Sequence, residues 1–312
     1  MNKKKFLFFL MGPTAIGKSS LALEIKKKFP LIELISVDSK LVYKGLNIGT
    51  DKPNKSDLKN FSYKLVNIVK PKNIYTVINF YNDVLKEIKN ILKSGKIPLL
   101  VGGTMLYFKI LLNGFANLPP SNSIIRKYIF KNICLKKKKN LFNLLKKIDP
   151  ISSKKIHIND VQRVLRAVEV FFVSGGFPLS ELIKFFHNKL PYKVFQFGLI
   201  PDNKEHLYKK IEKRFFFMLK SGFKKEVQNL YNQKFLDPKL PSMNSIGYKQ
   251  MLLYLKNKYT YFQMIKETIK STHKLVKHQL TWLKKWPNII FIKDNKKDLL
   301  ITKIYKILNR NL

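Results

Sequence analysis

The chain has 312 residues, of which 45% are hydrophobic and 13% aromatic, which favours a globular protein of two domains or one domain with a large insertion. Its 61 lysines and arginines against 19 acidic residues give a formal net charge of +42, which favours a polyanionic partner such as nucleic acid. The single cysteine, Cys134, excludes an intramolecular disulfide and a multi-cysteine metal site, and is typical of a cytoplasmic protein.

Arginine is rare in this lysine-rich chain, with only five residues. Part of the lysine excess reflects coding bias on a solvated surface, so a single lysine carries little information. Each arginine is more informative, because lysine cannot replace the planar fork of a guanidinium group on phosphate. We therefore expect most of Arg126, Arg163, Arg166 and Arg214 to contact phosphate.

The first element is a short apolar run at residues 6–11, too short for a secretory signal or a membrane span, and we predict a buried strand there. Similar runs predict buried parallel strands at 34–37, 63–69, 97–101 and 194–200. Helical periodicity separates the first four strands, for example at 19–29 and 78–92. This alternation predicts a doubly wound α/β fold with a parallel sheet.

The alternation stops at about residue 119, and helical periodicity without a convincing strand continues to about residue 191. We predict a helical insertion domain at 119–192, within a core domain made of 1–118 and 193–312. The last strand and the C-terminal helices belong to the second part of the core. These helices are predicted at 204–219, 224–233 and 260–286.

A glycine loop follows the first strand and has the spacing of a P-loop between a strand and a helix. Its members, the predicted pyrophosphate-binding residues, are Gly12, Pro13, Thr14, Ala15, Ile16, Gly17, Lys18 and Ser19. Backbone N–H groups, the helix N-terminus and the lysine make a socket for pyrophosphate, and Ser19 can hold Mg²⁺. The motif is specific for phosphate rather than for ATP, and on its own it favours a nucleotide-dependent kinase or NTPase.

Two further strand ends carry polar side chains, Asp38 after the second strand and Thr104 after the glycine pair Gly102-Gly103. The carboxyl ends of parallel strands face one crevice, so we expect both near the P-loop. The Asp38 carboxylate is either a Mg²⁺ ligand of the ordinary NTPase kind or a general base for an acceptor amine.

Six motifs in order along the chain resemble the bacterial tRNA dimethylallyltransferase family. They lie at 10–15, 35–39, 43–45 with 48–50, 101–107, 162–163 with 166–167, and 246–248 with 250–251. The resemblance extends to about Trp286. The chain departs from the family pattern at Lys277-His278-Gln279, where a second basic residue usually precedes the glutamine.

The resemblance implies a P-loop NTPase-like fold and transfer of a dimethylallyl group from dimethylallyl pyrophosphate to tRNA. The acceptor would be N6 of the adenosine immediately 3′ of the anticodon, in tRNAs that read codons beginning with U. It implies catalytic roles for Asp38, Thr14 and Arg214, the cofactor Mg²⁺, a monomeric enzyme without a membrane partner, and an insertion domain that contacts the anticodon stem–loop. The family's RNA contacts map to Asp38, Ser39, Lys40, Leu41, Thr104, Arg126, Gln162, Arg163, Val164, Leu165, Arg166, Asn244, Ser245, Ile246, Gly247, Tyr248 and Lys249.

Three other functions remain open from the residues alone: a P-loop small-molecule kinase, a prenyltransferase of free adenine nucleotides, and an RNA-binding GTPase. The GTPase is the least favoured of the three. We expect four of the five histidines to be structural or on the surface, because none of the four has partners at metal spacing; they are His157, His187, His206 and His273. Trp282 and Trp286 are expected in the core, and Tyr107 is a candidate to line the prenyl site.

Overall fold

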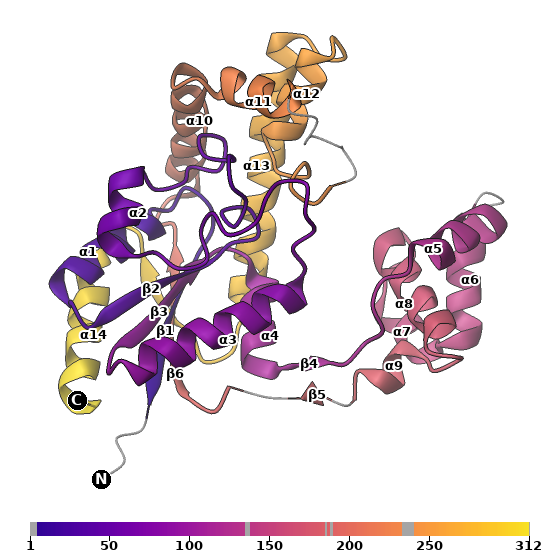
Figure 1. The fold of residues 1–312 in the computed structure, drawn as a ribbon, viewed down its shortest axis with the longest axis horizontal. Helices are drawn as coiled ribbons and strands as arrows, with labels where there is room; N and C mark the ends of the chain where they lie inside the picture. Colours follow the sequence, from indigo (N-terminus) through magenta and orange to yellow (C-terminus); the bar gives the residue numbers. More distant parts are fainter. Residues whose placement is uncertain (1–4, 135–137, 185, 188–189, 233–239, 312) are drawn as a thin grey trace. The chain divides into compact units, whose positions relative to one another are not determined.

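The computed structural model describes residues 5–134, 138–184, 186–187, 190–232 and 240–311. It divides into two compact units (Figure 1). The first consists of Met1–Lys109 with Tyr192–Leu312, and the second of Ile110–Pro191. The second unit thus begins before the predicted insertion boundary at 119.

The first unit contains a parallel five-stranded sheet in the order β2-β3-β1-β6-β7. Its strands are β1 (Phe6–Met11), β2 (Ile32–Val37), β3 (Ile97–Gly102), β6 (Lys193–Ile200) and β7 (Ile290–Lys293). The central strand β1 pairs with β3 on one side and with β6 on the other. The predicted α/β fold with a parallel sheet is confirmed.

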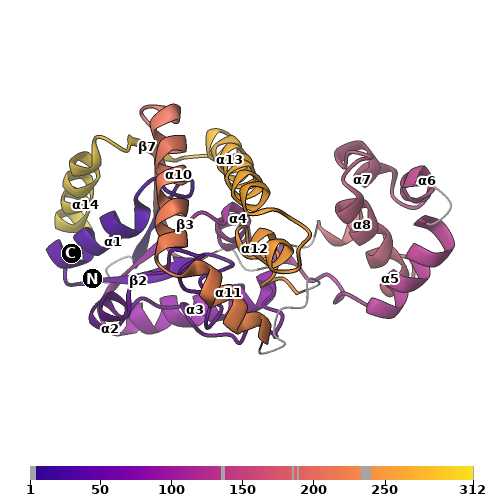
Figure 2. The ribbon, with the colours of Figure 1, turned by 90° about the horizontal axis from the view of Figure 1, so that it is seen from above.

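Helices cover the sheet on both faces, and Figure 2 shows α1 and α14 on one face and α3 on the other. Side chains of β1 alternate between these faces. Phe8 packs with residues of α1 and α14, whereas Phe9 contacts Phe108 on the opposite face. All six β1 residues are buried for this reason, and a buried phenylalanine contributes about 1.5–3 kcal/mol. The helices of this unit are α1 (Lys18–Lys28), α2 (Lys55–Phe61), α3 (Val77–Lys93), α4 (Met105–Asn113, which continues into the second unit), α10 (Lys204–Lys220), α11 (Phe223–Asn232), α12 (Tyr248–Leu255), α13 (Tyr261–Lys284) and α14 (Lys297–Asn311).

The long helix α13 carries several residues of the site and begins at a capping box. The Thr260 hydroxyl accepts from the backbone N–H of Gln263, and the Gln263 side chain accepts from the Thr260 N–H. Buried side chains such as Met264 and Val276 follow the apolar face of the helix. The capping box therefore fixes where α13 begins, and the buried apolar face fixes which side of the helix faces the core.

One expected strand of the sheet is absent from the described residues, and one strand of the sheet was not expected. Residues 63–69 form no strand but only isolated bridges, Ile35 with Lys64 and Tyr43 with Val69. Leu65 and Asn67 have φ of 61° and 58°, and this left-handed backbone interrupts an extended run. The edge strand β7 was not predicted, although three of its four residues are apolar; only one of the four is buried, as is typical of a short strand at a sheet edge.

The second unit is helical around its own small core, which includes Ile129, Leu141, Leu145 and Val168. Its helices are α5 (Ser123–Ile129), the π-helix η1 (Phe130–Cys134), α6 (Lys138–Ile148), α7 (Pro150–Lys155), α8 (Val161–Val173) and α9 (Leu179–Leu182). A short antiparallel pair, β4 (Phe115–Ala116) with β5 (Phe186–His187), joins the two ends of the unit.

Candidate active site

The P-loop connects β1 to α1 at the carboxyl edge of the sheet. Gly17 has φ 91° immediately before α1, a left-handed conformation that glycine adopts without steric cost. A Cβ atom on Gly12 would lie 3.1 Å from the Leu199 carbonyl oxygen of β6. The two glycines therefore permit the close approach to β6 and the turn into the helix N-terminus, where backbone N–H groups favour an anion.

Two cavities meet beside this loop. An apolar cavity of about 420 Å³ has a lining that includes Met105, Leu106 and Phe215, and a polar cavity of about 320 Å³ has a lining that includes Lys18, Ser19 and Asp51. Both are lined by Thr14, Ala15, Asp38, Thr50 and Arg214. The predicted catalytic residues thus lie where a polar compartment adjoins an apolar one.

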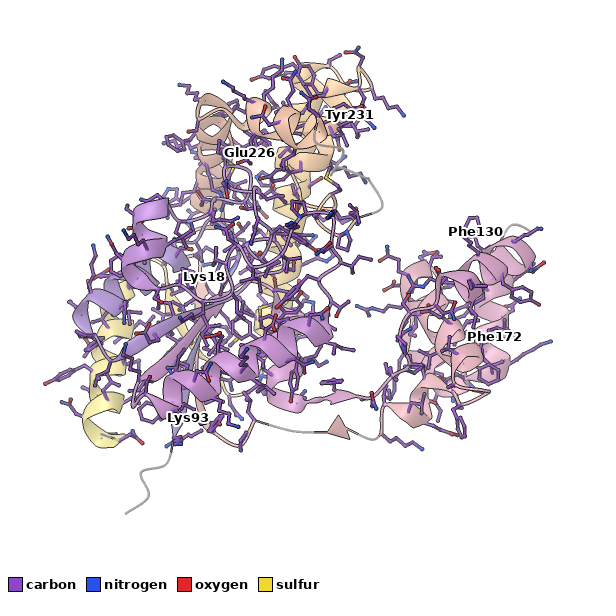
Figure 3. All side chains as sticks on the ribbon, viewed as in Figure 1. Lys18, Lys93, Phe130, Phe172, Glu226 and Tyr231 are labelled. Carbon is purple, nitrogen blue, oxygen red and sulfur yellow. The ribbon has the colours of Figure 1, made fainter. Side chains whose placement is uncertain are left out.

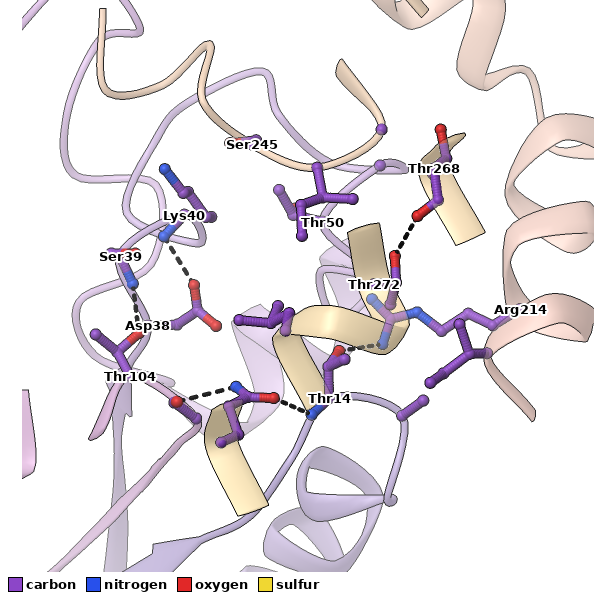
Figure 4. A pocket seen from close by; sticks show the side chains of 18 of the residues that line it. Thr14, Asp38, Ser39, Lys40, Thr50, Thr104, Arg214, Ser245, Thr268 and Thr272 are labelled. Atoms are coloured by element: carbon purple, nitrogen blue, oxygen red, sulfur yellow. Dashed lines mark hydrogen bonds between the residues drawn. The ribbon is translucent and has the colours of Figure 1, made fainter. Parts of the chain in front are cut away.

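Asp38 is held at this junction by the backbone that follows it. Its Oδ1 accepts hydrogen bonds from the Lys40 N–H at 2.7 Å and the Leu41 N–H at 3.3 Å. Among the described residues, none donates to Oδ2. The Thr104 hydroxyl accepts from the Ser39 N–H at 3.2 Å, which ties the end of β3 to that of β2 (Figure 4). One carboxylate oxygen fixes the side chain and the other is available for a ligand.

Arg214 reaches the junction from α10, and two side chains orient it. Its Nη1 donates to the Thr14 hydroxyl at 3.0 Å, and its Nε lies 3.3 Å from Asp51 Oδ2. Gln279 on α13 accepts from the Thr14 N–H at 2.9 Å and donates to the Gly103 carbonyl at 2.9 Å (Figure 4). A Cβ on Gly103 would approach Gln279 Nε2 to 2.5 Å, so glycine leaves the space for this bridge.

Lys18 occupies the polar cavity with its Nζ 2.6 Å from the Pro13 carbonyl oxygen. Burial lowers the pKa of Lys18 to about 7, with the neighbouring Asp38 carboxylate acting in the opposite sense and Arg214 in the same sense. A desolvated ammonium group of this kind requires an anionic partner to be fully charged at neutral pH.

The loop at residues 43–52, one wall of both cavities, is fixed by Glu226 of α11, which is labelled in Figure 3. The Glu226 carboxylate accepts from the backbone N–H groups of Asn47, Ile48 and Gly49, and from the Tyr248 hydroxyl. Sequence reasoning missed Glu226, Asp51 and the bridging role of Gln279. Their partners are far away along the chain, 179 residues for Glu226 and Asn47, so no local pattern indicates them.

The predicted RNA-contact segment at 244–249 divides into two groups. Asn244, Ser245, Ile246 and Gly247 line the apolar cavity, and Lys249 is exposed. The Tyr248 side chain is completely buried and bonded to Glu226, so its predicted RNA contact is wrong for the side chain.

In the second unit, the predicted RNA contacts gather around a buried carboxylate. Glu169 is fully buried, accepts two hydrogen bonds from Arg126, and accepts one from Arg166 at 2.7 Å. Burial would raise the pKa of Glu169, but the hydrogen bonds from Arg126 and Arg166 hold it below its ordinary value. Both arginines remain partly exposed, at 43% and 30%. Val164 is buried in the unit's core, so its side chain is not available to RNA.

The other two arginines for which phosphate contacts were predicted, Arg163 and Arg214, lie in different surroundings. Arg163 is 68% exposed and pairs with Asp160 on the same helix, while Gln162 beside it is exposed. Leu165 packs partly against the helical core. Arg214 lies at the P-loop, and the expectation that most of these arginines contact phosphate stays a prediction.

Among the aromatic residues, the prediction for Trp282 is wrong, because it lines the apolar cavity instead of filling the core, with Lys109 Nζ 5.6 Å from its ring centre. Trp286 is buried as predicted, and its indole N–H donates to Gln196. Tyr107 is also buried, stacks on Phe80 and does not line the apolar cavity.

The oxygen ligands of the polar cavity are suitable for Mg²⁺. Ser19 offers a hydroxyl, and Asp38 and Asp51 offer carboxylates. Mg²⁺ is usually held by one or two carboxylates together with substrate phosphates and water, so this sparse set fits. No group of three or more His, Cys, Asp or Glu side chains able to hold a metal occurs in the described part of the chain.

The chain has the fold and site of a P-loop α/β enzyme. Its P-loop lies at the carboxyl edge of a parallel sheet, and a polar and an apolar cavity beside the loop share an aspartate and an arginine. The model of the IPP transferase family matches residues 41–286 of this chain. The chain therefore belongs to the IPP transferase family. No helix within the described ranges is long and apolar enough to cross a membrane.

Full-length relatives support the same family. A tRNA dimethylallyltransferase of Buchnera aphidicola subsp. Baizongia pistaciae is 50% identical over 99% of this chain and 96% of its own length. Another from Wigglesworthia glossinidia brevipalpis is 48% identical over 97% and 94%. The solved structure of tRNA delta(2)-isopentenylpyrophosphate transferase from Staphylococcus epidermidis is 30% identical, with a TM-score of 0.69 over 99% of this chain and 100% of that chain. A eukaryotic dimethylallyltransferase acting on tRNA gives a TM-score of 0.78 at 26% identity, over 93% and 74%.

Proposed function

We propose that the chain transfers a dimethylallyl group from dimethylallyl pyrophosphate to N6 of the adenosine immediately 3′ of the anticodon, in tRNAs that read codons beginning with U. The observation that carries this proposal is the junction of the two cavities at Asp38 and Arg214. The polar cavity suits the diphosphate and the apolar cavity suits the dimethylallyl chain, so the reactive carbon lies between them.

The reaction forms a bond between N6 and C1 of the dimethylallyl group and breaks the bond between C1 and the diphosphate oxygen. The bonding electrons leave with the diphosphate, and a proton leaves N6. The adenine amine is a weak nucleophile, because its lone pair is delocalised into the ring. Asp38 Oδ2 accepts the N6 proton as the new bond forms, while Oδ1 keeps its backbone hydrogen bonds.

Negative charge grows on the leaving diphosphate, and three groups are placed to stabilise it. They are the N–H groups of the P-loop, the Lys18 ammonium and the Arg214 guanidinium, which Thr14 and Asp51 hold in place. Ser19 would hold Mg²⁺ beside the diphosphate, and the ion would supply further charge neutralisation there. Since the fixed groups need little reorganisation, they favour the transition state over the bound donor.

The acceptor adenosine reaches Asp38 only when it leaves the base stack of the anticodon loop. Residues of the apolar cavity, including Ile246 and Trp282, offer apolar and aromatic surface for an extruded base and for the prenyl chain. We propose that the partly exposed Arg126 and Arg166 bind the RNA backbone, with Glu169 holding their side chains. We propose that the enzyme is a monomer, since one chain supplies all residues of the junction. We also propose that it acts in the cytoplasm, which its single cysteine favours.

The decisive experiment incubates the enzyme with labelled dimethylallyl pyrophosphate and Mg²⁺, and offers tRNA, AMP and a mixture of ATP with small-molecule kinase substrates in parallel. Label should appear on tRNA alone. Label on AMP would support a prenyltransferase of free nucleotides, and phosphoryl transfer from ATP without prenylated RNA would support the kinase. The family assignment does not favour the kinase.

Donor binding should take up protons at mildly alkaline pH. The pKa of Lys18 is about 7 in the free enzyme, so at pH 8 most of the side chain is neutral. A bound diphosphate stabilises the ammonium and raises its pKa, so Lys18 takes up a proton when the donor binds above pH about 7. The affinity for the donor therefore falls as the pH rises.

Calorimetry at pH 8 in buffers of different ionisation enthalpy measures this uptake. Lys18→Met is the control, because it removes the proton uptake by the lysine and leaves the proton uptake by the donor itself. Equal proton uptake by the wild type and Lys18→Met would contradict the prediction.

Binding of tRNA should weaken steeply with salt, because the positive side chains of the chain replace counterions on the RNA. Between about 50 and 200 mM salt, the affinity is expected to fall by about a hundredfold or more. Fluorescence anisotropy with labelled tRNA measures this slope. A flat response would show that the net charge of +42 plays no part in RNA binding.

A further inference from the structure

Lys210 is a basic side chain of the polar cavity that the proposed mechanism leaves without a role. It lies one helical turn before Arg214 on α10, and residues four apart share one face of a helix. Lys210, Arg214 and Lys18 all line this cavity. Helix α10 therefore presents two cations, rather than one, to the space beside the P-loop.

An anchored carboxylate holds Lys210 in this position. Lys210 Nζ lies 3.1 Å from Asp294 Oδ2, while Asp294 Oδ1 accepts from the Asp202 N–H at 2.9 Å. Burial would raise the pKa of Asp294, but the hydrogen bonds from the Asp202 N–H and from Lys210 hold it below its ordinary value. The Asp294 side chain is only 10% exposed and Lys210 is 54% exposed. The carboxylate is thus a fixed support, and the ammonium is accessible to a ligand.

Stability alone explains this arrangement poorly. An ion pair with a half-exposed lysine contributes little to folding, because water and salt screen the charges. The exposed neighbours Lys209 and Lys213 on the same helix line neither of the two cavities. Lys210 differs from them by its anchor and by its place at the cavity, and both features suit the binding of an anion.

We propose that Lys210 is a further pyrophosphate-binding residue of the donor site and that Asp294 is its positioning residue. This inference rests on the proposed function of the polar cavity. The Arg214 guanidinium binds in a fixed planar geometry, whereas the Lys210 ammonium is a mobile point charge that can follow the diphosphate as it leaves. Two cations one turn apart on α10 thus act on the same leaving group.

Steady-state kinetics of Lys210→Ala tests the proposal against the adjacent control Lys209→Ala. We expect the KM for dimethylallyl pyrophosphate to rise about tenfold or more in Lys210→Ala, the size expected for one lost charge-assisted hydrogen bond. The KM for tRNA should stay unchanged, and Lys210→Arg should restore most of the donor affinity. Equal donor KM values for Lys210→Ala and Lys209→Ala, or a rise in the KM for tRNA alone, would overturn the proposal.

The positioning role of Asp294 has a separate readout. Asp294→Asn keeps an oxygen for the Asp202 N–H but loses the charge that holds Lys210, so the donor KM should rise by less than in Lys210→Ala. In a Lys210→Ala background, Asp294→Asn should cause no further rise, because the residue that it positions is absent. Additive effects of the two substitutions would show that Asp294 acts independently of Lys210.

Direct titration with inorganic pyrophosphate separates this inference from the proposed function. If the wild type binds pyrophosphate, Lys18→Met binds it more weakly and Lys210→Ala binds it as tightly as the wild type, only the role of Lys210 is refuted. If the wild type binds no pyrophosphate, both the donor site and the role of Lys210 are refuted. Weaker binding by Lys210→Ala than by Lys209→Ala supports the proposal.

Discussion

Replacement of Asp38 with asparagine is expected to lower kcat for dimethylallyl transfer by about 10²- to 10⁴-fold, the usual contribution of a general base. Asparagine is nearly isosteric, and its Oδ1 can still accept from the Lys40 and Leu41 N–H groups. Only Oδ2, the oxygen that takes the N6 proton, is replaced by an amide nitrogen. The substitution therefore removes the base and keeps the local fold.

Single-turnover transfer to tRNA, with both substrates saturating, measures this loss without interference from product release. Thermal unfolding and the KM for dimethylallyl pyrophosphate should stay close to wild-type values. Asp57→Asn on α2 is a matched control, because it removes a carboxylate outside the two cavities. Activity of Asp38→Asn within about tenfold of the wild type would exclude Asp38 as the base.

Arg214→Ala should lower kcat/KM for the donor by about 10²- to 10³-fold, the range for one lost donor to a developing negative charge. The guanidinium is oriented by Thr14 and Asp51, so its planar fork lies in a defined position at the end of the P-loop. Arg214→Lys should remain impaired, because an ammonium group cannot satisfy both partners and the diphosphate in the same geometry.

Lys213→Ala is the control for this experiment, since Lys213 precedes Arg214 on α10 and is exposed. Pyrophosphate titration should show weaker binding by Arg214→Ala, whereas tRNA affinity stays unchanged. A fall in tRNA affinity with intact pyrophosphate binding would move Arg214 from the donor site to the acceptor site.

The P-loop, Asp38 and Thr104 could be located from the sequence because local rules apply to them. Each follows a short apolar strand, and the carboxyl ends of parallel strands meet at one edge of a sheet. Side-chain and backbone contacts in the structure confirm that Asp38 and Thr104 lie together there. Arg214 lies far along the chain in a helix without a comparable signal, and the resemblance to a known family indicated it.

At residues 63–69 the local apolar pattern predicts a strand that the structure does not have. The run has the composition of a buried strand, yet Leu65 and Asn67 adopt a left-handed backbone. Part of the cause is tertiary, because Asn67 Oδ1 accepts from Lys52 Nζ at 2.7 Å. Lys52 also donates to the Tyr43 carbonyl, so the segment is folded around the loop that forms the site instead of extending along the sheet.

The sequence by itself determined the parallel α/β sheet, the phosphate loop and the helical insertion pattern, because strand alternation, glycine spacing and helical periodicity are properties of neighbouring residues. Only the tertiary structure decided the partners of the site: Gln279 on the P-loop, Glu226 on the loop at 43–52, and Asp51 on Arg214. A hydrogen bond or an ion pair between distant segments depends on where the packed core places their backbones. No local pattern records that placement, so these contacts appear only when the chain has folded.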